Sequence, residues 1–412
     1  MAGARVAYIL LWFPEPSQTF VLNEVNTLDK LGLDLTVYTL YGPRPAARVA
    51  GMGPVAAPVR RLGLAATGTL VKELAHLRSN WGSEARRFLA KVMVRRWRSL
   101  ETAGEALWAA LAGVHLARLL VADKITHIHA PWADGPATAA WVASHLTGIP
   151  FSFSARAGDI FPPDGALAEK IRAASFVRTN NQANISYLAG LAEEERSKFR
   201  LVYNGVSLKN CLPAPAPMAP PVQILSLGRF ARTKGYDVLL RAAKMLEDMG
   251  LEFHLTLAGA GWRGAQLKYL AWRLGLGPRV SFPGFIPYDR VSALFAASDV
   301  FVMPCVIHSS SDRDGIPNVI MEALLHRLPV VATDVSGISE VIRDRDTGLL
   351  VPQKDAVALA VAIKAMVGDR KAALEMAERG RALVFRQFDT EENHRKILAL
   401  FNDPDVHRNG MK

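Results

Sequence analysis

The stretch that decides the fold is LSLGRFARTKGYDVLLRAAKML, residues 225–246. Its apolar start predicts a buried strand that ends at Gly228, and helical spacing of apolar residues begins near Tyr236. Arg229 and Lys234 therefore lie in a loop at the carboxyl end of a strand, where open α/β sheets bind ligands, and glycine permits close backbone approach. Two cations beside a helix N-terminus suit a diphosphate, although such a loop read alone also fits an ordinary solvated turn.

A second segment with acidic residues at the start of a predicted helix is DGIPNVIMEAL, residues 314–324. Pro317 suits the first turn of a helix, so Asp314 lies at the mouth of that helix and Glu322 a little over one turn inside it. Eight residues advance a helix by about 80° beyond whole turns, so both carboxylates can face one cleft. A carboxylate is a natural partner for the vicinal hydroxyls of a sugar; the alternative is a capping Asp with an exposed helix Glu.

Short apolar runs alternate with helix-like stretches along the chain, which indicates parallel sheets covered by helices. The Pro/Ala stretch CLPAPAPMAPP, residues 211–221, cannot continue a helix or pair as a central strand, so it separates two α/β halves. The predicted strands are 6–11, 33–40, 125–129, 151–154, 223–227, 253–258, 280–283, 300–303 and 329–332. The predicted divisions are an N-terminal domain (1–208), a linker (209–221), a C-terminal domain (222–385) and a helix with tail (386–412) that returns across the junction.

The order of the parts carries a family resemblance. The Arg/Lys loop is followed by AGAG at 258–261, FPGF at 282–285, the acidic pair, and PVVATDVSGISEVIRDRDTGLLVP at 329–352. This order resembles the donor domain of the retaining family 4 glycosyltransferases of GT-B fold. The resemblance implies two Rossmann-like, doubly wound domains that face a cleft, with the nucleotide-sugar donor domain after the linker and the acceptor-side domain before it.

The resemblance also implies roles in the Arg/Lys loop. Arg229 and Lys234 would clamp the diphosphate of the leaving nucleotide, with Gly228 beside them. Clamping that phosphate would supply electrostatic stabilisation as the departing phosphate takes the acceptor's proton. No metal or other cofactor is implied, because two cations can neutralise the diphosphate and the loop holds no DxD-type ligand pair.

Further donor contacts are implied around the acidic pair. Glu322 would hold the donor ribose, and Asp314 stands where the family's usual first glutamate contacts the transferred sugar. The backbone amides of Gly315 and Ile316 would lie nearby, and Ile286 would lie by the base.

The N-terminal half resembles the polysaccharide-assembly members of the family in PSQTFVLNEV, residues 16–25, and IPFSFSARAGDIF, residues 149–161. In the second stretch the family generally has a histidine in the cleft, whereas this sequence has Arg156. In HIHAPWA, Pro131 stands where such members often have another histidine. Arg156 can bind a phosphate bidentately, but its permanent charge prevents it from acting as a general base.

The acceptor-side candidates are Thr19, Arg156 and Asp159. Asp159 admits a second interpretation, because Asp is also a common capping residue of loops and helices. His127 and His129 alternate on an apolar run that predicts a buried strand, so we interpret both as structural.

The net charge of +11 and the pI of about 9.7 favour acidic partners: nucleotide sugars, lipid phosphates or anionic membranes. Residues 60–98 hold ten Lys/Arg, and Arg87, Lys91, Arg95 and Arg98 recur at helical spacing. A basic amphipathic helix of this kind can rest on anionic lipid, or it can be a surface helix with a solvated basic face. No finger or helix-turn-helix pattern accompanies the charge, so no nucleic-acid partner is predicted.

Cys211 and Cys305 lack metal-ligand spacing and are interpreted as reduced thiols of a cytoplasmic protein. The apolar run 6–13 is too short to cross a bilayer and predicts a buried first strand.

Together these features predict a retaining glycosyltransferase that moves a hexose from a nucleoside-diphosphate sugar to a glycan or lipid-linked acceptor. Its expected setting is surface or exopolysaccharide biosynthesis, at the inner face of the cytoplasmic membrane or free in the cytoplasm. Two alternatives stay open: a sugar-nucleotide epimerase on the same architecture, and a non-catalytic protein that binds sugar nucleotides or glycans.

Overall fold

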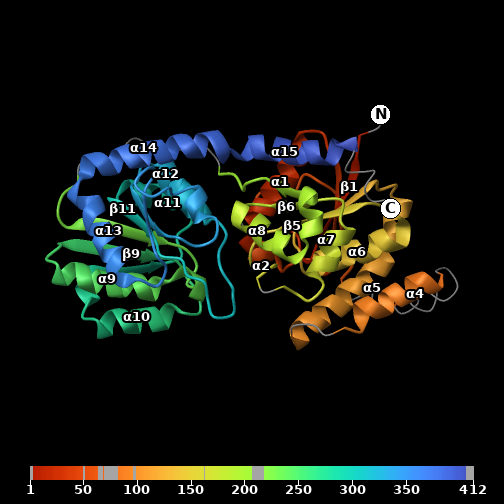
Figure 1. The fold of residues 1–412 in the computed structure, drawn as a ribbon, viewed down its shortest axis with the longest axis horizontal. Helices are drawn as coiled ribbons and strands as arrows, with labels where there is room; N and C mark the ends of the chain where they lie inside the picture. Colours follow the sequence, from red (N-terminus) through yellow and green to blue (C-terminus); the bar gives the residue numbers. More distant parts are fainter. Residues whose placement is uncertain are drawn as a thin grey trace. The chain divides into compact units, whose positions relative to one another are not determined.

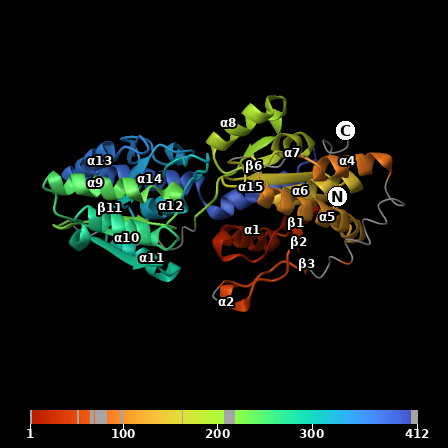
Figure 2. The ribbon, with the colours of Figure 1, turned by 90° about the horizontal axis from the view of Figure 1, so that it is seen from below.

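The computed structural model describes residues 3–49, 52–63, 68, 82–95, 99–161, 163–206 and 218–404. The chain divides into two compact units, each built around its own parallel sheet (Figures 1 and 2). Unit 1 comprises Met1–Asn180, Asn184–Val202 and Glu391–Lys412, and unit 2 comprises Asn181–Ala183 and Tyr203–Thr390. The chain therefore passes back to unit 1 at its C-terminal end.

Unit 1 is a seven-stranded parallel sheet in the order β3-β2-β1-β4-β5-β6-β7. The strand order reverses direction between β1 and β4, as in doubly wound folds. The strands are β1 (Arg5–Leu10), β2 (Asp34–Thr39), β3 (Val59–Arg61), β4 (His127–Ala130), β5 (Phe151–Ala155), β6 (Val177–Thr179) and β7 (Phe199–Leu201).

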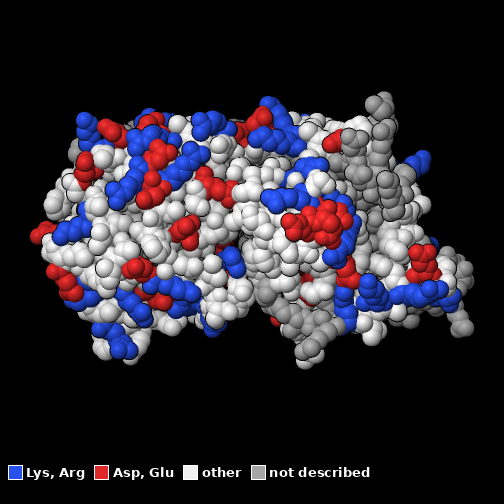
Figure 3. Space-filling view, viewed as in Figure 1, with Lys and Arg blue, Asp and Glu red and all other residues white. Residues whose placement is uncertain are grey.

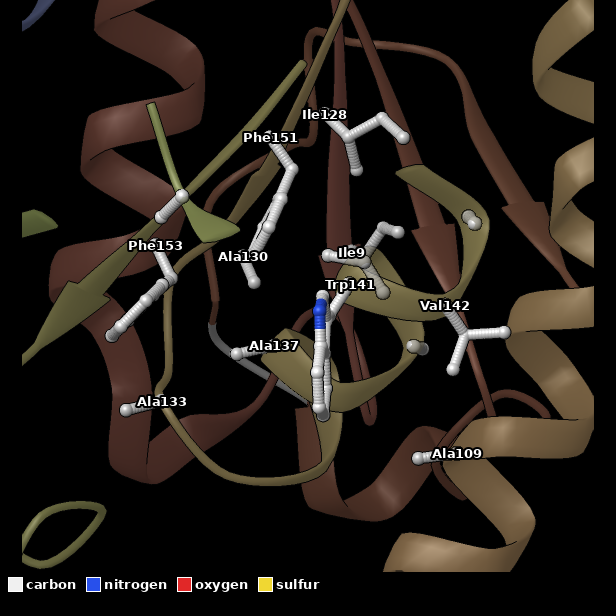
Figure 4. Close-up of a cluster of buried hydrophobic side chains, with 14 of the residues drawn as sticks. Ile9, Ala109, Ile128, Ala130, Ala133, Ala137, Trp141, Val142, Phe151 and Phe153 are labelled. Atoms are coloured by element: carbon white, nitrogen blue, oxygen red, sulfur yellow. The ribbon is translucent and has the colours of Figure 1, made fainter. Parts of the chain in front are cut away.

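Helices cover both faces of this sheet. They are α1 (Thr19–Lys30), α2 (Ala46–Val49), α4 (Ser83–Met93), α5 (Leu100–Ala122), α6 (Gly135–Thr147), α7 (Leu167–Ala173), α8 (Gln182–Leu191) and α15 (Thr390–Asn402), with short 3-10 turns at Pro16–Gln18 and Glu193–Lys198. One face packs against α4 to α7, and Figure 4 shows Trp141 of α6 lying among Ile9, Ile128 and Phe151 of the strands. The other face packs against α1 and α15, where Phe401 lies within 6.1 Å of the ring of Tyr8.

Helix α5 is long and apolar enough to cross a membrane by length and composition, and half of its apolar window is buried inside the protein. Its small residues allow it to pack closely on α6. A Cβ atom at Gly113 would lie 2.7 Å from the carbonyl oxygen of Ala139. The contact with α6 gives α5 a place in the core of unit 1 (Figure 4).

Unit 2 is a six-stranded parallel sheet in the order β10-β9-β8-β11-β12-β13. Its strands are β8 (Val222–Leu227), β9 (Phe253–Ala258), β10 (Val280–Gly284), β11 (Val300–Met303), β12 (Val330–Thr333) and β13 (Leu349–Val351). Its helices are α9 (Tyr236–Asp248), α10 (Gly264–Arg273), α11 (Tyr288–Ala296), α12 (Asn318–Leu325), α13 (Ala356–Gly368) and α14 (Arg370–Gln387), with 3-10 turns at Arg232–Lys234, Gly277–Arg279 and Ile338–Glu340. One face packs against α9, α10 and α13, and the other against α11 and α12.

These two doubly wound sheets confirm the predicted α/β fold, and all nine predicted strands are present within two residues of their predicted ends. Four three-residue strands were not predicted: β3, β6, β7 and β13. The Pro/Ala linker lies largely outside the described residues, which resume at residue 218. The predicted C-terminal helix (386–412) is α15, which begins at Thr390 because the chain leaves helical geometry at Phe388, after α14.

Candidate active site

The strand order of unit 2 reverses between β8 and β11, which lie side by side at the centre of the sheet. Ligands of open α/β sheets bind at the carboxyl ends of strands at such a reversal. The loops that follow β8 and β11 and the segment before α12 meet there. They carry Arg229, Lys234, Cys305 and Asp314.

The loop after β8 is held by backbone contacts that only glycine permits. Gly235 is the residue before α9 and has φ +62°, and a Cβ atom there would lie 1.9 Å from the carbonyl oxygen of Pro304. Gly259, after β9, has φ +142°, and a Cβ atom there would lie 1.9 Å from the carbonyl oxygen of Gly228. These close approaches fix the path of the chain between β8 and α9, and thereby fix where Lys234 lies.

Lys234 is the central cation of this loop. Its side chain is only 11% exposed, and its Nζ lies 3.6 Å from Oδ2 of Asp314. Burial is the largest influence and opposes the charged form of Lys234, but the neighbouring groups, Asp314 foremost, together outweigh burial and raise the pKa of Lys234. Arg229 is exposed and close enough to act electrostatically on Lys234, so the two predicted cations do lie together.

Cys305 is a member of this cluster that sequence reasoning missed. Its thiol is buried, it lies 3.9 Å from Oδ2 of Asp314, and burial raises its pKa to about 12, so the thiol is neutral. The sequence feature that could have identified Cys305 as a site residue is its position two residues after β11, at the carboxyl end of a central strand. Cys305 is a free cysteine as predicted, and Cys211 lies outside the described residues.

The acidic pair lies at the start of α12. The helix begins at Asn318 and Pro317 is its N-cap, so Pro317 lies just before the first turn rather than in it as predicted. Asp314 and the buried residues Gly315 and Ile316 precede the helix. Ile316 and the half-buried Ile286 belong to one hydrophobic cluster, so these two candidates come together in unit 2.

Glu322 lies on α12, one turn inside the helix, with only a small part of its surface exposed. Burial raises the pKa of its carboxyl group to about 7. Its side chain makes no hydrogen bond or ion pair with the residues that the structure describes. When it ionises above this pKa, the carboxylate can accept hydrogen bonds from the hydroxyl groups of a ligand that enters the site.

The acceptor-side candidates belong to unit 1 and are engaged within it. The guanidinium of Arg156 lies 3.4 Å from Oε2 of Glu24 and 4.5 Å from the ring of Phe20, and burial lowers its pKa to about 10. Asp159 accepts hydrogen bonds from the backbone N–H groups of Ala133, Arg156 and Ala157. These bonds agree with the capping interpretation of Asp159.

The remaining N-terminal candidates differ in exposure. Thr19 is the exposed first residue of α1. His127 and His129 are fully buried and both bond to the hydroxyl of Ser152, which confirms their structural role. Burial lowers the pKa of His129 well below its usual value, so its ring is neutral.

The predicted basic helix is α4, whose exposed cations form a row in Figure 3. Leu89 and Val92 are buried on its inner face, as its spacing predicted. Lys91 and Arg95 both pair with Glu169, so this one carboxylate offsets one of the two positive charges. Arg98 lies outside the described residues.

Residues 216–383 match the family model of the group 1 glycosyl transferases. The matched segment covers 168 of the 412 residues. It contains the Lys234–Asp314 pair and Glu322, so the candidate site lies inside the matched segment.

Some curated relatives of the chain are named for polysaccharide biosynthesis. The chain is 33% identical over 208 residues to the putative colanic acid biosynthesis glycosyltransferase WcaL of Escherichia coli, covering 50% of this chain and 51% of that protein. It is 32% identical over 180 residues to the amylovoran biosynthesis glycosyltransferase AmsK of Erwinia amylovora, covering 44% of each. The chain thus spans about half the length of the curated relatives it matches.

Solved structures resemble the whole chain. HepE of Anabaena, in complex with UDP, has a TM-score of 0.68 at 17% identity, over 96% of this chain and 98% of that one. TarM has a TM-score of 0.71 at 13% identity, over 97% of this chain and 99% of that one. Likeness at such low identity establishes the fold, and the fold is that of GT-B glycosyltransferases.

Proposed function

We propose that the protein is a retaining glycosyltransferase that moves a hexose from a nucleoside-diphosphate sugar to a glycan or lipid-linked acceptor in surface or exopolysaccharide biosynthesis. The observation that carries the proposal is the buried Lys234 ammonium beside Asp314, at the sheet reversal of the segment that matches the group 1 glycosyl transferases. The names of WcaL and AmsK support the polysaccharide setting. UDP in the HepE complex supports a nucleoside diphosphate as the leaving group.

In this proposal the donor is held by groups of unit 2. Arg229 and Lys234 bind the diphosphate, and Glu322 accepts hydrogen bonds from the ribose hydroxyls. Gly228 lets the backbone approach the phosphates. Asp314 contacts the transferred sugar, at the cost of its pairing with Lys234.

The amides of Gly315 and Ile316 complete the sugar contact in this proposal, and Ile286 packs against the base. The bond from the anomeric carbon to the phosphate oxygen breaks as the acceptor oxygen bonds to the same face of that carbon. The departing phosphate takes the proton of the acceptor hydroxyl. Two cations that neutralise the leaving diphosphate favour this step without a metal ion.

The acceptor-side roles of Thr19, Arg156 and Asp159 stay predictions, as does a cytoplasmic location without a nucleic-acid partner. For Arg156 the role requires the guanidinium to reach a ligand while it remains paired with Glu24. An acceptor phosphate would suit such a group, because Arg binds phosphate bidentately.

The proposal is tested by thermal shift and hydrolysis with UDP-, GDP- and ADP-sugars, using wild type, Lys234→Ala and Glu322→Ala. The matched control is Lys244→Ala, because Lys244 is on α9 close in sequence to the site but pairs with Glu247 on the surface. We expect one donor to stabilise the wild type and the control, and neither site variant. No stabilisation by any nucleotide sugar would refute the donor site, and conversion of free donor without an acceptor would favour the epimerase.

Stereochemistry tests the finer part of the proposal. The anomeric configuration of the product, followed by NMR from the earliest turnover, should equal that of the donor sugar. An inverted product would refute the retaining mechanism while leaving the donor site intact. Tight donor binding with no transfer to any acceptor would favour the non-catalytic binding protein.

A further inference from the structure

Helix α10 presents aromatic side chains to solvent. Trp262, just before the helix, is 67% exposed, Tyr269 is 57% exposed and Trp272 is 71% exposed. The rings of Tyr269 and Trp272 lie 5.8 Å apart on one side of the helix. Large aromatic groups are rarely left in water singly at such exposure, and three together mark an interaction surface.

The inner face of α10 already completes the fold. Leu267 and Ala271 are buried against the core that α9 and α13 share, and Leu276 closes the end of that contact. Figure 1 shows α10 at the margin of unit 2, on the outer side of α9. Tyr269 and Trp272 therefore lie outside this core, and their exposure indicates a binding partner.

Lys and Arg side chains accompany these aromatic groups, and two of them, Arg263 and Arg279, pair with Asp237 and Glu247 of α9. Residues 253–288 contain four Lys/Arg and neither Asp nor Glu. Lys268 and Arg273 are exposed on α10 and form no ion pair with any residue that the structure describes. Figure 3 shows Lys and Arg side chains at the lower margin of unit 2, where α10 lies in Figure 1.

We propose that this surface, formed by Trp262, Lys268, Tyr269, Trp272 and Arg273 and here called the α10 surface, binds an anionic phospholipid bilayer. Trp and Tyr favour the headgroup level of a membrane, where the ring is in an apolar medium and the polar edge stays hydrated. Lys268 and Arg273, which are exposed beside them, can reach lipid phosphates. The inference is independent of the proposed function.

The combination distinguishes α10 from the basic helix α4. On α4 the aromatic Phe88 is stacked against His145, and Lys91 is paired with Glu169. Among the described residues of α4 itself the exposed face thus offers charge without an exposed aromatic side chain, while the aliphatic Val94 at its end is exposed. Charge alone is screened by salt, whereas an aromatic anchor is not, so α10 should bind in salt that releases α4.

The test is co-sedimentation of the full chain with vesicles of phosphatidylcholine, alone or mixed with phosphatidylglycerol. The variant Lys268→Glu/Arg273→Glu reverses both cations, and Tyr269→Ser/Trp272→Ser removes the anchors. The matched control is Arg86→Glu/Arg87→Glu, which makes the same charge change on the exposed face of α4. Trp262 is kept, because Arg232 lies over its ring and reaches back toward the donor loop.

We expect the wild type and the α4 control to bind the phosphatidylglycerol vesicles. The charge-reversed α10 variant should bind them at least about 20-fold more weakly, since each cation near the surface contributes about fivefold. The aromatic variant should show a smaller blue shift of tryptophan emission on vesicles, because Trp272 is removed and Trp262 is kept. Equal binding by all variants, or loss of binding only in the α4 control, would overturn the proposal.

Binding to a soluble polysaccharide provides a further test. Unchanged vesicle binding together with lost binding to a soluble anionic polysaccharide such as heparin would make the α10 surface a glycan site and overturn the lipid proposal. Retained stabilisation by the nucleotide sugar shows that the variants are folded. If the nucleotide sugar does not stabilise the wild type, that result counts against the proposed donor site and not against the α10 surface.

Discussion

Replacement of Glu322 by glutamine tests two effects of this carboxyl group: the loss of folding stability caused by its burial, and its contribution to donor affinity. Its pKa rises from 4.5 to about 7 on folding, which corresponds to about 3 kcal/mol at about 1.4 kcal/mol per unit. Between these two values the folded protein holds a proton that the unfolded chain releases, so the free energy of unfolding of the wild type falls as the pH rises. Glutamine does not titrate, so the free energy of unfolding of the variant does not fall in this way as the pH rises.

The assay is urea denaturation of wild type and Glu322→Gln from pH 4 to pH 8. We expect the stability difference to move in favour of the variant by about 2 to 3 kcal/mol, with most of the change between pH 4.5 and 7. Glu375→Gln is the control, because Glu375 is exposed on α14 and its replacement should give a nearly constant difference. A pH-independent difference for Glu322→Gln would refute the burial argument.

The same variant should bind the donor at least about tenfold more weakly at pH 8, because an ionised carboxylate is a stronger acceptor for ribose hydroxyls than an amide. In the wild type, donor affinity should rise as the pH passes through 7. Equal affinity of both proteins at pH 8, measured by calorimetry, would remove Glu322 from the donor site.

Three other results follow from the structure. Gly235→Ala should lower the free energy of unfolding by more than about 2 kcal/mol, because its Cβ would clash with Pro304. The control Gly250→Ala, at φ +77° with open space around it, should lower it by about 1 kcal/mol. Similar losses in the two variants would contradict the clash at Gly235. Arg178→Ala should cost about 3 kcal/mol by urea denaturation, because it strips the buried Glu24 of its 2.7 Å partner, and a near-neutral effect would mean that Glu24 relaxes into water. EDTA should leave donor-induced thermal stabilisation unchanged, and its loss, restored by Mg²⁺, would refute a metal-free diphosphate site.

The buried network in unit 1 shows where local sequence reasoning stops. The pattern around Arg156 identified a cation in place of a histidine, but nothing in that pattern names Glu24 of α1 as its partner. The carboxylate of Glu24 is held ionised with a lowered pKa because Arg178 and Arg156 outweigh the effect of burial. The three residues are on different elements, and only the folded sheet brings them together.

The sequence by itself determined the alternation of strands and helices, the two α/β halves, and the loop that carries Arg229 and Lys234. These features follow from hydrophobic periodicity and from glycine and proline, which act over a few neighbouring residues. Strands of three residues such as β13 were not predicted, because so short a run shows no hydrophobic periodicity.

Only the tertiary structure decided which groups meet and what burial does to them. It brought Cys305 and Asp314 to Lys234, raised the pKa of Glu322 to about 7, and left Trp272 in solvent. Contact and solvation depend on atoms distant in sequence, and electrostatic energies change steeply with burial. A local pattern can therefore name the chemical groups of a site, but the packing of the whole unit sets their charge and exposure.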